Sequence, residues 1–599
     1  MVNYASRLEY AVTNTDINKI DYGQIFLLAR TEFRLPNKVM IIRIITLIFL
    51  SYFTYSKPAN AQINPQPVIP TPQPLPRVDP LPPPDDLLQP PEAPSTFPSS
   101  PPLQVPGKIT VTQFAVVGST VFSPTQLATV LQPFTSRPIA FAELLEAQAA
   151  VTQLYFDRGY VTSGAFIPPQ TLQDGTVVIE VVEGQVEEIE IAGLKRLNSG
   201  YIRSRIESSI EAPLNQNQLF QSLQLLQLDP LIQKLSVNLT AGSRPGLSRL
   251  EVAVEEAPAF FAQISADNLR SPSVGTVRRQ VQVSHNNLTG FGDRLNATYY
   301  NTEGSNTLDD FSYTIPINAK NGTISLRHRR TRSEIIEEPF DELDIDTKSR
   351  TYEVGFRQPI YQTPTTEITL GLTGSLEESK TTLLGEPFPG SVGAEDDGEI
   401  RISSVRFFQE YAARTTKDVF VARSEFSFGI NVFDATVNQR APDSRYFSWR
   451  GQAQYLRLLA PDTVFLVRSD IQLAPRSLFP QEQFSLGGGL SVRGYRQDAL
   501  LADNGVFISS EFRLPIMRVR DWNTTLQLTP FFDFGTVWNS NELEFSEPTL
   551  ASTGVGLRLQ VGTRFSAQLD WGIPLIDIDT NGDSWQEDGI YFYLKYRAF

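Results

Sequence analysis

Large apolar residues alternate with polar or small residues in segment after segment between Phe260 and Phe599. The stretch Phe565–Ile573 is typical, because every odd-numbered residue in it is apolar and the residues between them are Ser, Gln, Asp and Gly. A period of two places successive side chains on opposite faces of a β-strand. No apolar run in this region approaches the ~20 residues that a membrane-spanning helix needs. We therefore predict a long series of strands with one apolar and one polar face.

A soluble β-sandwich would show the same alternation, so the period alone does not decide the fold. A membrane barrel is favoured by the aromatic content, which includes 38 Phe and 20 Tyr, and by an export signal near the N-terminus. Polar insertions at 334–348 and 377–399 suit external loops. A strand with its connection takes roughly 20 residues, so this region holds about 16 strands. We predict a transmembrane antiparallel β-barrel over residues 259–599.

A short pattern occurs twice before this region. Phe114–Gly118 and Ile189–Gly193 both alternate and both end in Gly, and each is followed five residues later by a helix-start signal, at Ser123 and Asn198. The repeat predicts two tandem β-α-α-β-β units, at residues 108–184 and 185–258.

In the first unit the pattern predicts a capping box that begins at Ser123, a helix over Phe141–Asp157, and strands over Ser163–Ile167 and Thr176–Val182. In the second unit it predicts two helices and then strands over Lys234–Thr240 and Ser248–Glu255. The apolar faces of these two helices comprise Ile202, Ile206 and Ile210, and Leu219, Leu223 and Leu226.

The N-terminal residues carry a targeting pattern. Val39–Tyr55 is mostly apolar and is followed by Ala59-Asn60-Ala61, which is typical of a cleaved secretory signal. A membrane anchor is the alternative, but the uninterrupted apolar part is about half the length of a span. We assign residues 1–61 to an N-terminal extension and signal peptide, with Met40 well placed to be the true start.

Residues 62–107 contain 17 prolines and predict an extended linker rather than a packed domain. Whether this linker is a disordered leader or a binding arm stays open. The only candidate for a short helical turn in it is Asp85–Gln89.

Composition excludes several classes of function. The chain has 51 Lys and Arg against 66 Asp and Glu, and a net charge of −15 argues against nucleic acid as a partner. With no Cys and two His, thiolate metal sites, disulfides and thiol nucleophiles are excluded, and no cofactor is predicted. No Gly-x-Ser-x-Gly elbow and no phosphate-binding loop occur, so we predict neither an enzyme nor a nucleotide motor.

Two motifs in the barrel region point to a site. One is Val492-Arg493-Gly494-Tyr495, and the other is Phe532-Asp533-Phe534-Gly535. The alternation of the predicted strand Thr525–Trp538 places Asp533 on the polar, lumen-facing side, where a carboxylate requires a cation as partner.

These motifs resemble the sixth-loop and strand motifs of the outer-membrane-protein-assembly superfamily, and the two α/β units resemble POTRA domains. With only two such units and a Pro-rich leader, the chain most closely resembles the two-partner secretion transporters of the hemolysin secretion/activation family, over residues 109–599. The resemblance implies that the sixth loop folds into the barrel and that Arg493 binds Asp533. It also implies that Gly494 permits a close turn and that Tyr495 offers a stacking surface, with Phe532 and Gly535 completing the strand motif.

A terminal Phe, here Phe599, is the usual assembly signal of such barrels. Lys595 and Arg597 share its position in the alternation, so the signal is imperfect. Either a bulge shifts the last strand near Arg597, or recognition tolerates the change.

The resemblance implies an outer-membrane transporter whose POTRA domains, in the periplasm, bind an unfolded, β-rich exoprotein that is then secreted through the barrel pore. Outer-membrane lipids and the barrel-assembly machinery are the other expected partners. The alternative is a β-barrel assembly or insertion factor of the same superfamily, for which more POTRA units would be expected. An N-terminal plug helix, known in some members, is not evident.

Overall fold

A computed structural model describes residues 75–76, 78–82, 108–541, 547–578, 582 and 584–599. The predictions for the signal peptide, the true start and the turn Asp85–Gln89 lie outside these residues. Among the described residues, no helix is both long and apolar enough to cross a bilayer.

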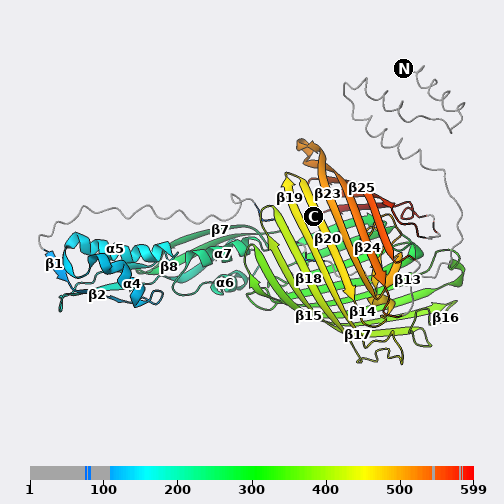
Figure 1. Cartoon of the computed structure of the whole chain (residues 1–599), viewed down its shortest axis with the longest axis horizontal. Helices are drawn as coiled ribbons and strands as arrows, with labels where there is room; N and C mark the ends of the chain where they lie inside the picture. The colour runs from blue at the N-terminus through cyan, green and yellow to red at the C-terminus, as the bar shows by residue number, and fades with distance from the viewer. Residues whose placement is uncertain (1–74, 77, 83–107, 542–546, 579–581, 583) are drawn as a thin grey trace, which may run out of the picture. The chain divides into compact units, whose positions relative to one another are not determined.

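The first α/β unit is a three-stranded sheet covered by helices (Figure 1). Its sheet order is β2-β5-β4, with β2 parallel and β4 antiparallel to the central β5. The elements are β2 (Gln113–Val117), α4 (Pro124–Leu131), η3 (Gln132–Phe134), α5 (Phe141–Asp157), β4 (Gly164–Phe166) and β5 (Thr176–Val182). The capping box at Ser123 is present, and α5 and β5 have the predicted bounds. A two-stranded sheet joins β1 (Lys108–Val111) to β3 (Arg137–Ala140). The sequence pattern did not predict this sheet, because β3 is short and contains a proline, which is unusual within a strand.

The second α/β unit repeats this topology with the order β6-β8-β7. Its elements are β6 (Gln185–Ala192), α6 (Ser199–Glu207), α7 (Gln216–Gln227), β7 (Ile232–Ala241) and β8 (Leu247–Glu256). Ile202 and Ile206 are buried as expected. The prediction for Ile210 is wrong in one respect, because α6 ends at Glu207 and Ile210 packs against the core from the following turn.

The repeated Gly has one physical reason in both units. A Cβ at Gly118 would lie 2.4 Å from the carbonyl oxygen of Val181, and a Cβ at Gly193 would lie 2.3 Å from that of Val254. Both residues also have positive φ, 82° and 87°. The end of the first strand therefore approaches the central strand more closely than any side chain permits.

A glutamate two residues beyond each of these carbonyl groups completes the arrangement. Glu256 accepts hydrogen bonds from the backbone N–H groups of Lys195, Arg196 and Leu197 at 2.6–2.9 Å. Glu183 likewise accepts from the backbone of Thr120 at 2.7 Å. Burial raises the pKa of the Glu256 carboxyl, but these hydrogen bonds outweigh it and hold the pKa below its ordinary value.

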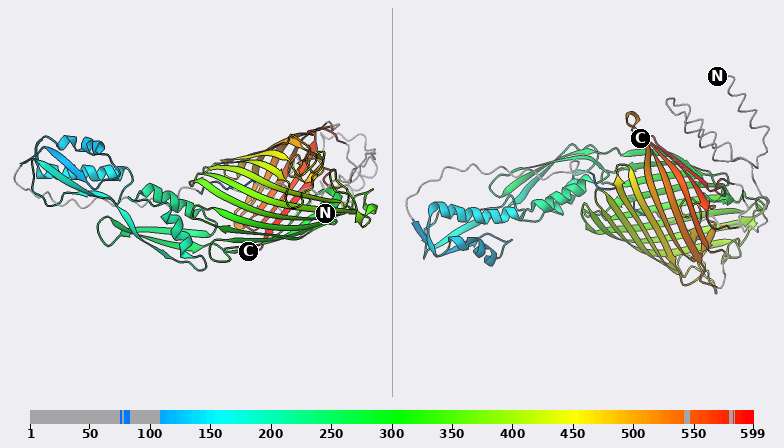
Figure 2. Two further views of the ribbon diagram at one scale, coloured as in Figure 1. Left: turned by 90° about the horizontal axis from the view of Figure 1, so that it is seen from below. Right: turned by 45° about the horizontal axis from the view of Figure 1, so that its top comes forward.

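Residues 260–597 form a closed antiparallel barrel (Figures 1 and 2). Its first strand, β9 (Phe260–Asp267), pairs with its last, β27 (Ile590–Arg597). Apart from β16 (Glu386–Pro387), a two-residue ladder in a loop, sixteen strands make up the barrel, which confirms the predicted fold. The others are β10 (Arg278–Asn286), β11 (Arg294–Asn301), β12 (Ser305–Pro316), β13 (Thr323–Glu334), β14 (Asp346–Gln362), β15 (Thr366–Leu383), β17 (Glu399–Arg414), β18 (Asp418–Ile430), β19 (Phe447–Ala460), β20 (Thr463–Leu473), β23 (Asn504–Val519), β24 (Thr524–Trp538), β25 (Thr549–Val561) and β26 (Phe565–Pro574).

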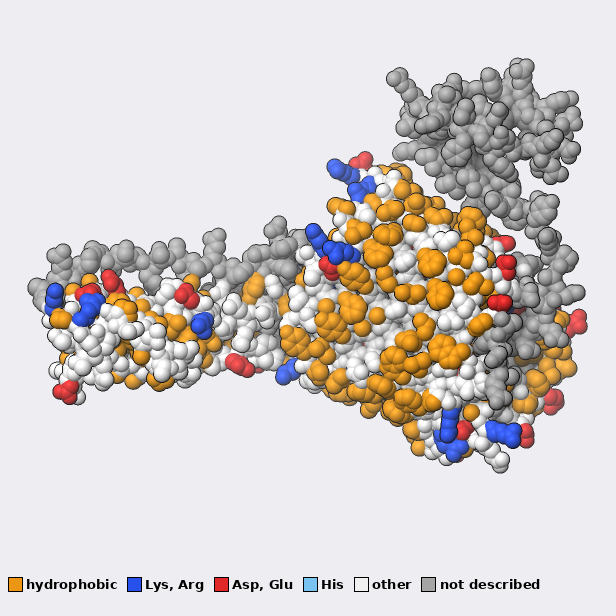
Figure 3. Space-filling model, in the orientation of Figure 1, with side chains coloured by type: hydrophobic (Ala, Val, Ile, Leu, Met, Phe, Trp, Pro, Cys, Tyr) orange, Lys and Arg blue, Asp and Glu red, His pale blue; other side chains and the backbone are white. Residues whose placement is uncertain are grey.

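The outer wall of the barrel is apolar, and charged side chains gather at its ends (Figure 3). On β15, for example, Leu372 is 47% exposed, whereas its neighbour Thr373 is 7% exposed on the lumen side. The end at which the chain enters β9 has short turns, and the opposite end has the long loops. We call these the turn end and the loop end.

Two predictions about the barrel need correction or completion. The insertion expected from Glu377 begins later, because β15 continues to Leu383 and is paired with β17 as far as Lys380 and with β14 as far as Thr382, although its side chains there are polar on both faces. At the C-terminus, β27 pairs with β9 without a bulge and ends at Arg597. Phe599 therefore lies beyond the strand, 71% exposed, with its ring centroid 6.0 Å from that of Phe260.

Candidate functional site: the loop inside the barrel

The longest connection of the barrel, residues 474–503 between β20 and β23, is the sixth at the loop end, and we call it L6. It contains η6 (Pro480–Glu482) and a small hairpin of β21 (Phe484–Leu486) and β22 (Leu500–Ala502). Most of its apolar side chains are buried against residues of the barrel wall, so L6 packs inside the barrel. One apolar cluster comprises Phe484, Leu486, Val492, Tyr495 and Ala502 from L6, and Phe507, Val537 and Leu550 from the wall.

The sequence motifs meet at Arg493. Its Nε and Nη2 donate to the two carboxylate oxygens of Asp533 at 2.8 and 3.0 Å, and its backbone N–H donates to the same carboxylate at 3.2 Å. The side chains of Arg493 and Asp533 are 2% and 0% exposed. The two-pronged contact fixes the orientation of the guanidinium as well as its position.

Two further carboxylates that the motifs did not reveal also face this guanidinium. Nη1 of Arg493 donates to Glu511 on β23 at 2.9 Å and lies 3.5 Å from Asp570 on β26. The guanidinium also lies 3.4 Å from the ring centroid of Phe531. Glu511 and Asp570 occupy lumen-facing positions of alternating strands, but alternation does not say which of many such residues will meet L6. We call Arg493 with Asp533, Glu511 and Asp570 the Arg493 site.

The residue after Arg493 lies against the backbone of β26. Gly494 has a φ of 98°, and a Cβ added to it would lie 3.2 Å from backbone atoms of Gly572 and Pro574. Its N–H donates to the hydroxyl of Tyr591 at 3.0 Å, and that hydroxyl donates to the carbonyl of Tyr495. L6 thus approaches the wall as closely as two backbones can.

Tyr495 has a different role from the stacking surface that the resemblance implies. The residue is 3% exposed, and its hydroxyl lies 2.8 Å from the carbonyl oxygens of Ala551 and Ile576. Val492 is fully buried beside it. In the strand motif, the side chain of Leu486 fills the space that a side chain at Gly535 would occupy. Phe532 is on the opposite, lipid-facing side and is 46% exposed.

L6 has a second attachment on another part of the wall. Glu482 in η6 binds Arg406 of β17 at 2.6 Å, with side chains 12% and 17% exposed. Beside it, Phe479 packs in an apolar cluster with Ile400 and Ile402 of the same strand. Counted around the barrel from β9, β17 is the eighth strand, whereas β23, β24 and β26, which carry the three carboxylates, are the twelfth, thirteenth and fifteenth. The two attachments therefore lie on different sides of the wall, and L6 crosses the lumen between them.

Comparison with known proteins adds the family. The sequence model of the haemolysin secretion/activation protein ShlB/FhaC/HecB family matches residues 246–559, more than half of the chain. The chain belongs to this family. The ShlB-type POTRA domain matches residues 109–184, the first α/β unit.

The relatives that the chain resembles are transporters. The chain is 21% identical over 490 residues to the heme/hemopexin transporter protein HuxB of Haemophilus influenzae (strain 86-028NP), covering 77% of this chain and 82% of HuxB. It is 23% identical over 441 residues to the outer membrane transporter CdiB of Dickeya dadantii (strain 3937), covering 71% and 75%. The solved structure of CdiB from Escherichia coli shares the fold, with a TM-score of 0.62 at 19% identity over 84% of this chain and 93% of CdiB.

The family assignment makes the protein a two-partner secretion transporter of the outer membrane, with its POTRA region in the periplasm. It favours transport over the alternative of an assembly factor. The turn end of the barrel therefore faces the periplasm, and the loop end faces the outside.

Proposed function

We propose that this transporter binds its exoprotein, in unfolded form, at the edges of its two α/β units and passes it through the barrel, and that the Arg493 site holds L6 in the position that shapes the conduit. The observation that carries the proposal is the arrangement of L6, which crosses the lumen with a buried arginine among three carboxylates at one side and a single ion pair at the other.

The expected docking surface lies within residues 161–182 and 234–255. In each sheet the central strand is paired with a neighbouring strand on both sides, whereas β4 and β7 lie at an edge. An edge strand pairs with an incoming extended segment through its backbone, which accepts many sequences. Because β7 has ten residues and β4 only three, β7 offers the longer edge. Beside β4, Phe166 and Leu172 are 40% and 38% exposed and supply apolar contacts.

The two attachments of L6 differ in strength, and this difference gives an order of release. The Arg493 site is nearly inaccessible to water and joins one guanidinium to three carboxylates, whereas the side chains of Arg406 and Glu482 are 17% and 12% exposed and, among the described residues, Arg406 forms an ion pair with Glu482 alone. Breaking a partly exposed ion pair costs less free energy than breaking a buried, hydrogen-bonded one. A passing chain would therefore displace the Glu482 side of L6 first, while the Arg493 side stays bound.

Direction and assembly complete the proposal. The chain has no nucleotide motor motif, so folding of the exoprotein outside the cell supplies much of the direction. Insertion of the barrel itself depends on the barrel-assembly machinery, with Phe599 as the terminal signal, and on outer-membrane lipids.

The test is deletion of residues 109–257 in cells that also express the candidate exoprotein. We expect the barrel to insert, as judged by its heat-modifiable migration, while secretion stops. Normal secretion by the deletion variant would refute the role of the α/β units. A fall in the abundance of unrelated outer-membrane barrels would instead support an assembly factor.

A further inference from the structure

The outward face of strands β13–β15 carries basic side chains directly above its apolar band. On β15 the outward apolar residues run from Ile368 to Leu376. At about 3.3 Å per residue and a tilt near 40°, these eight steps span roughly 20 Å, close to the height of the apolar band of a barrel. The band ends at a row in which His328, Tyr352 and Leu376 are direct neighbours.

The next two rows toward the loop end contain cations that face one another. Arg330 on β13 lies directly opposite Arg350 on β14. One row further, Lys348 on β14 lies opposite Arg332 on one side and Lys380 on the other. Like charges directly opposite each other destabilise a sheet unless an anion lies between them.

Protein carboxylates supply part of that negative charge. Arg332 binds Asp346 at 2.6 Å, and Lys380 binds Asp397 at 3.0 Å. Within the strands that the structure describes, Lys348 and Arg350 have no such ion pair, although Glu378 stands opposite Arg350 in the register. Both side chains are exposed, and they are two residues apart on one strand face.

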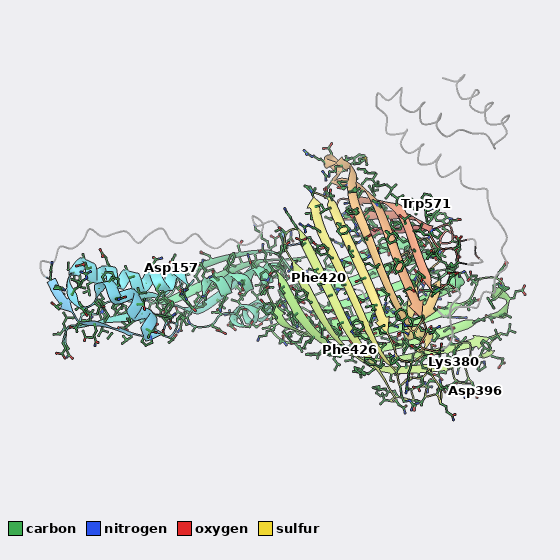
Figure 4. All side chains as sticks on the ribbon, in the orientation of Figure 1. Asp157, Lys380, Asp396, Phe420, Phe426 and Trp571 are labelled. Carbon is green, nitrogen blue, oxygen red and sulfur yellow. The ribbon has the colours of Figure 1, made fainter. Side chains whose placement is uncertain are left out.

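The position of these basic rows on the barrel shows which part of the membrane they face. They lie on the outer wall, outside the lumen, and Figure 4 places Lys380 at the loop end of the barrel. The loop end faces outward, so the rows stand at the level of the headgroups of the outer leaflet. Near the loop end of β18 and β26 the outward residues Phe428 and Ile573 are apolar and exposed, so the basic rows form a local patch and not a belt.

We propose that Lys348 and Arg350, with Arg332 and Lys380 beside them, bind the phosphate group of a lipid in the outer leaflet. The acyl chains of this lipid lie along the apolar face below Tyr352, and its phosphate neutralises the opposed cations above. The site lies outside the lumen and is independent of the proposed handling of the exoprotein.

The test is native mass spectrometry of the full-length protein, released from detergent micelles that contain bisphosphorylated lipid A, or the same lipid A after removal of its phosphates. Each basic side chain near an anionic group contributes a factor of roughly five to binding. The variant Lys348→Gln/Arg350→Gln should therefore lose roughly 25-fold in affinity for the phosphorylated lipid, and Lys348→Gln alone about fivefold.

The matched control is Lys417→Gln/Arg520→Gln, which removes the same charge from two turns at the periplasmic end, and it should bind the phosphorylated lipid as the unchanged protein does. Heat-modifiable migration reports that each barrel is folded. Equal binding of phosphorylated and dephosphorylated lipid A would overturn the proposal. So would unchanged binding by the two-site variant, or an equal loss in the control.

Discussion

Replacement of Arg493 by Ala tests the attachment of L6 in the most direct way. The change removes two hydrogen bonds to Asp533 and one to Glu511, and it leaves three carboxylates facing an empty space. The backbone N–H of residue 493 and the hydroxyl of Ser509 still donate to Asp533, at 3.2 and 2.6 Å, and Arg513 still binds Glu511 at 2.9 Å, but the buried carboxylates lose their central guanidinium. Breaking a buried ion pair by removing one partner costs about 3 to 5 kcal/mol. The population of detached L6 should therefore rise by about two to three and a half orders of magnitude.

The absence of cysteine from the chain makes this rise measurable. A Val492→Cys variant places one thiol at a fully buried position of L6, where a maleimide reacts only after the loop detaches. In the Arg493→Ala background, the labelling rate should increase at least 100-fold at unchanged barrel abundance, and secretion should fall sharply. Arg493→Lys should restore little of the protection, because an ammonium keeps the charge and loses the two-pronged contact.

Asp533→Ala should resemble Arg493→Ala, and the double variant should be little worse than either, as expected for two partners in one interaction. Arg476→Ala, at an exposed position of the same loop, is the matched control and should leave the labelling rate unchanged. Slow labelling in the Arg493→Ala background, or defects of the two single variants that simply add, would refute the assignment of this pair.

Three further predictions concern the lumen and the second α/β unit. Deletion of residues 486–504 should raise the conductance of the purified protein in planar bilayers, because L6 crosses the lumen; an unchanged, closed barrel would contradict the pore. Glu482→Gln should increase conductance fluctuations while the thiol at position 492 stays protected, whereas loss of that protection would show that the two attachments are not independent. Glu256→Gln should destabilise the second unit by roughly 1 to 3 kcal/mol at pH 7, because three N–H groups lose a charged acceptor. Since the folded-state pKa of Glu256 is lowered, its contribution is complete above the ordinary value of 4.5 and disappears as the pH falls through the folded-state value. The difference in stability between the variant and the unchanged protein should therefore shrink below pH 4.5 and vanish below the folded-state pKa, and the exposed neighbour Glu255, changed to Gln, should show no such effect.

Sequence patterns predicted those features that depend on local periodicity. Helix α5 is long and strongly periodic, and its bounds matched. The alternation of β24 placed Asp533 on the lumen side, where the residue is fully buried. Both inferences need only the geometry of a single element.

The features that the sequence did not reveal depend on contacts between distant elements. The barrel register and the path of L6 must be known before one can tell that Glu511 and Asp570 face Arg493, or that Arg406 binds Glu482. The same holds for the basic rows of β13–β15, since Lys348 and Lys380 are separated along the chain and meet only through strand pairing. Pairing register is a property of the whole sheet, so no local pattern encodes it.

The central claim is that this chain moves an unfolded exoprotein through its own barrel. The most direct measurement uses purified protein in lipid vesicles with the α/β units facing outward, to which the unfolded exoprotein is added without nucleotide. The account predicts that the exoprotein becomes protected from external protease, and that vesicles with the variant lacking residues 109–257 give no protection. Protection no greater than that of empty vesicles would contradict the account.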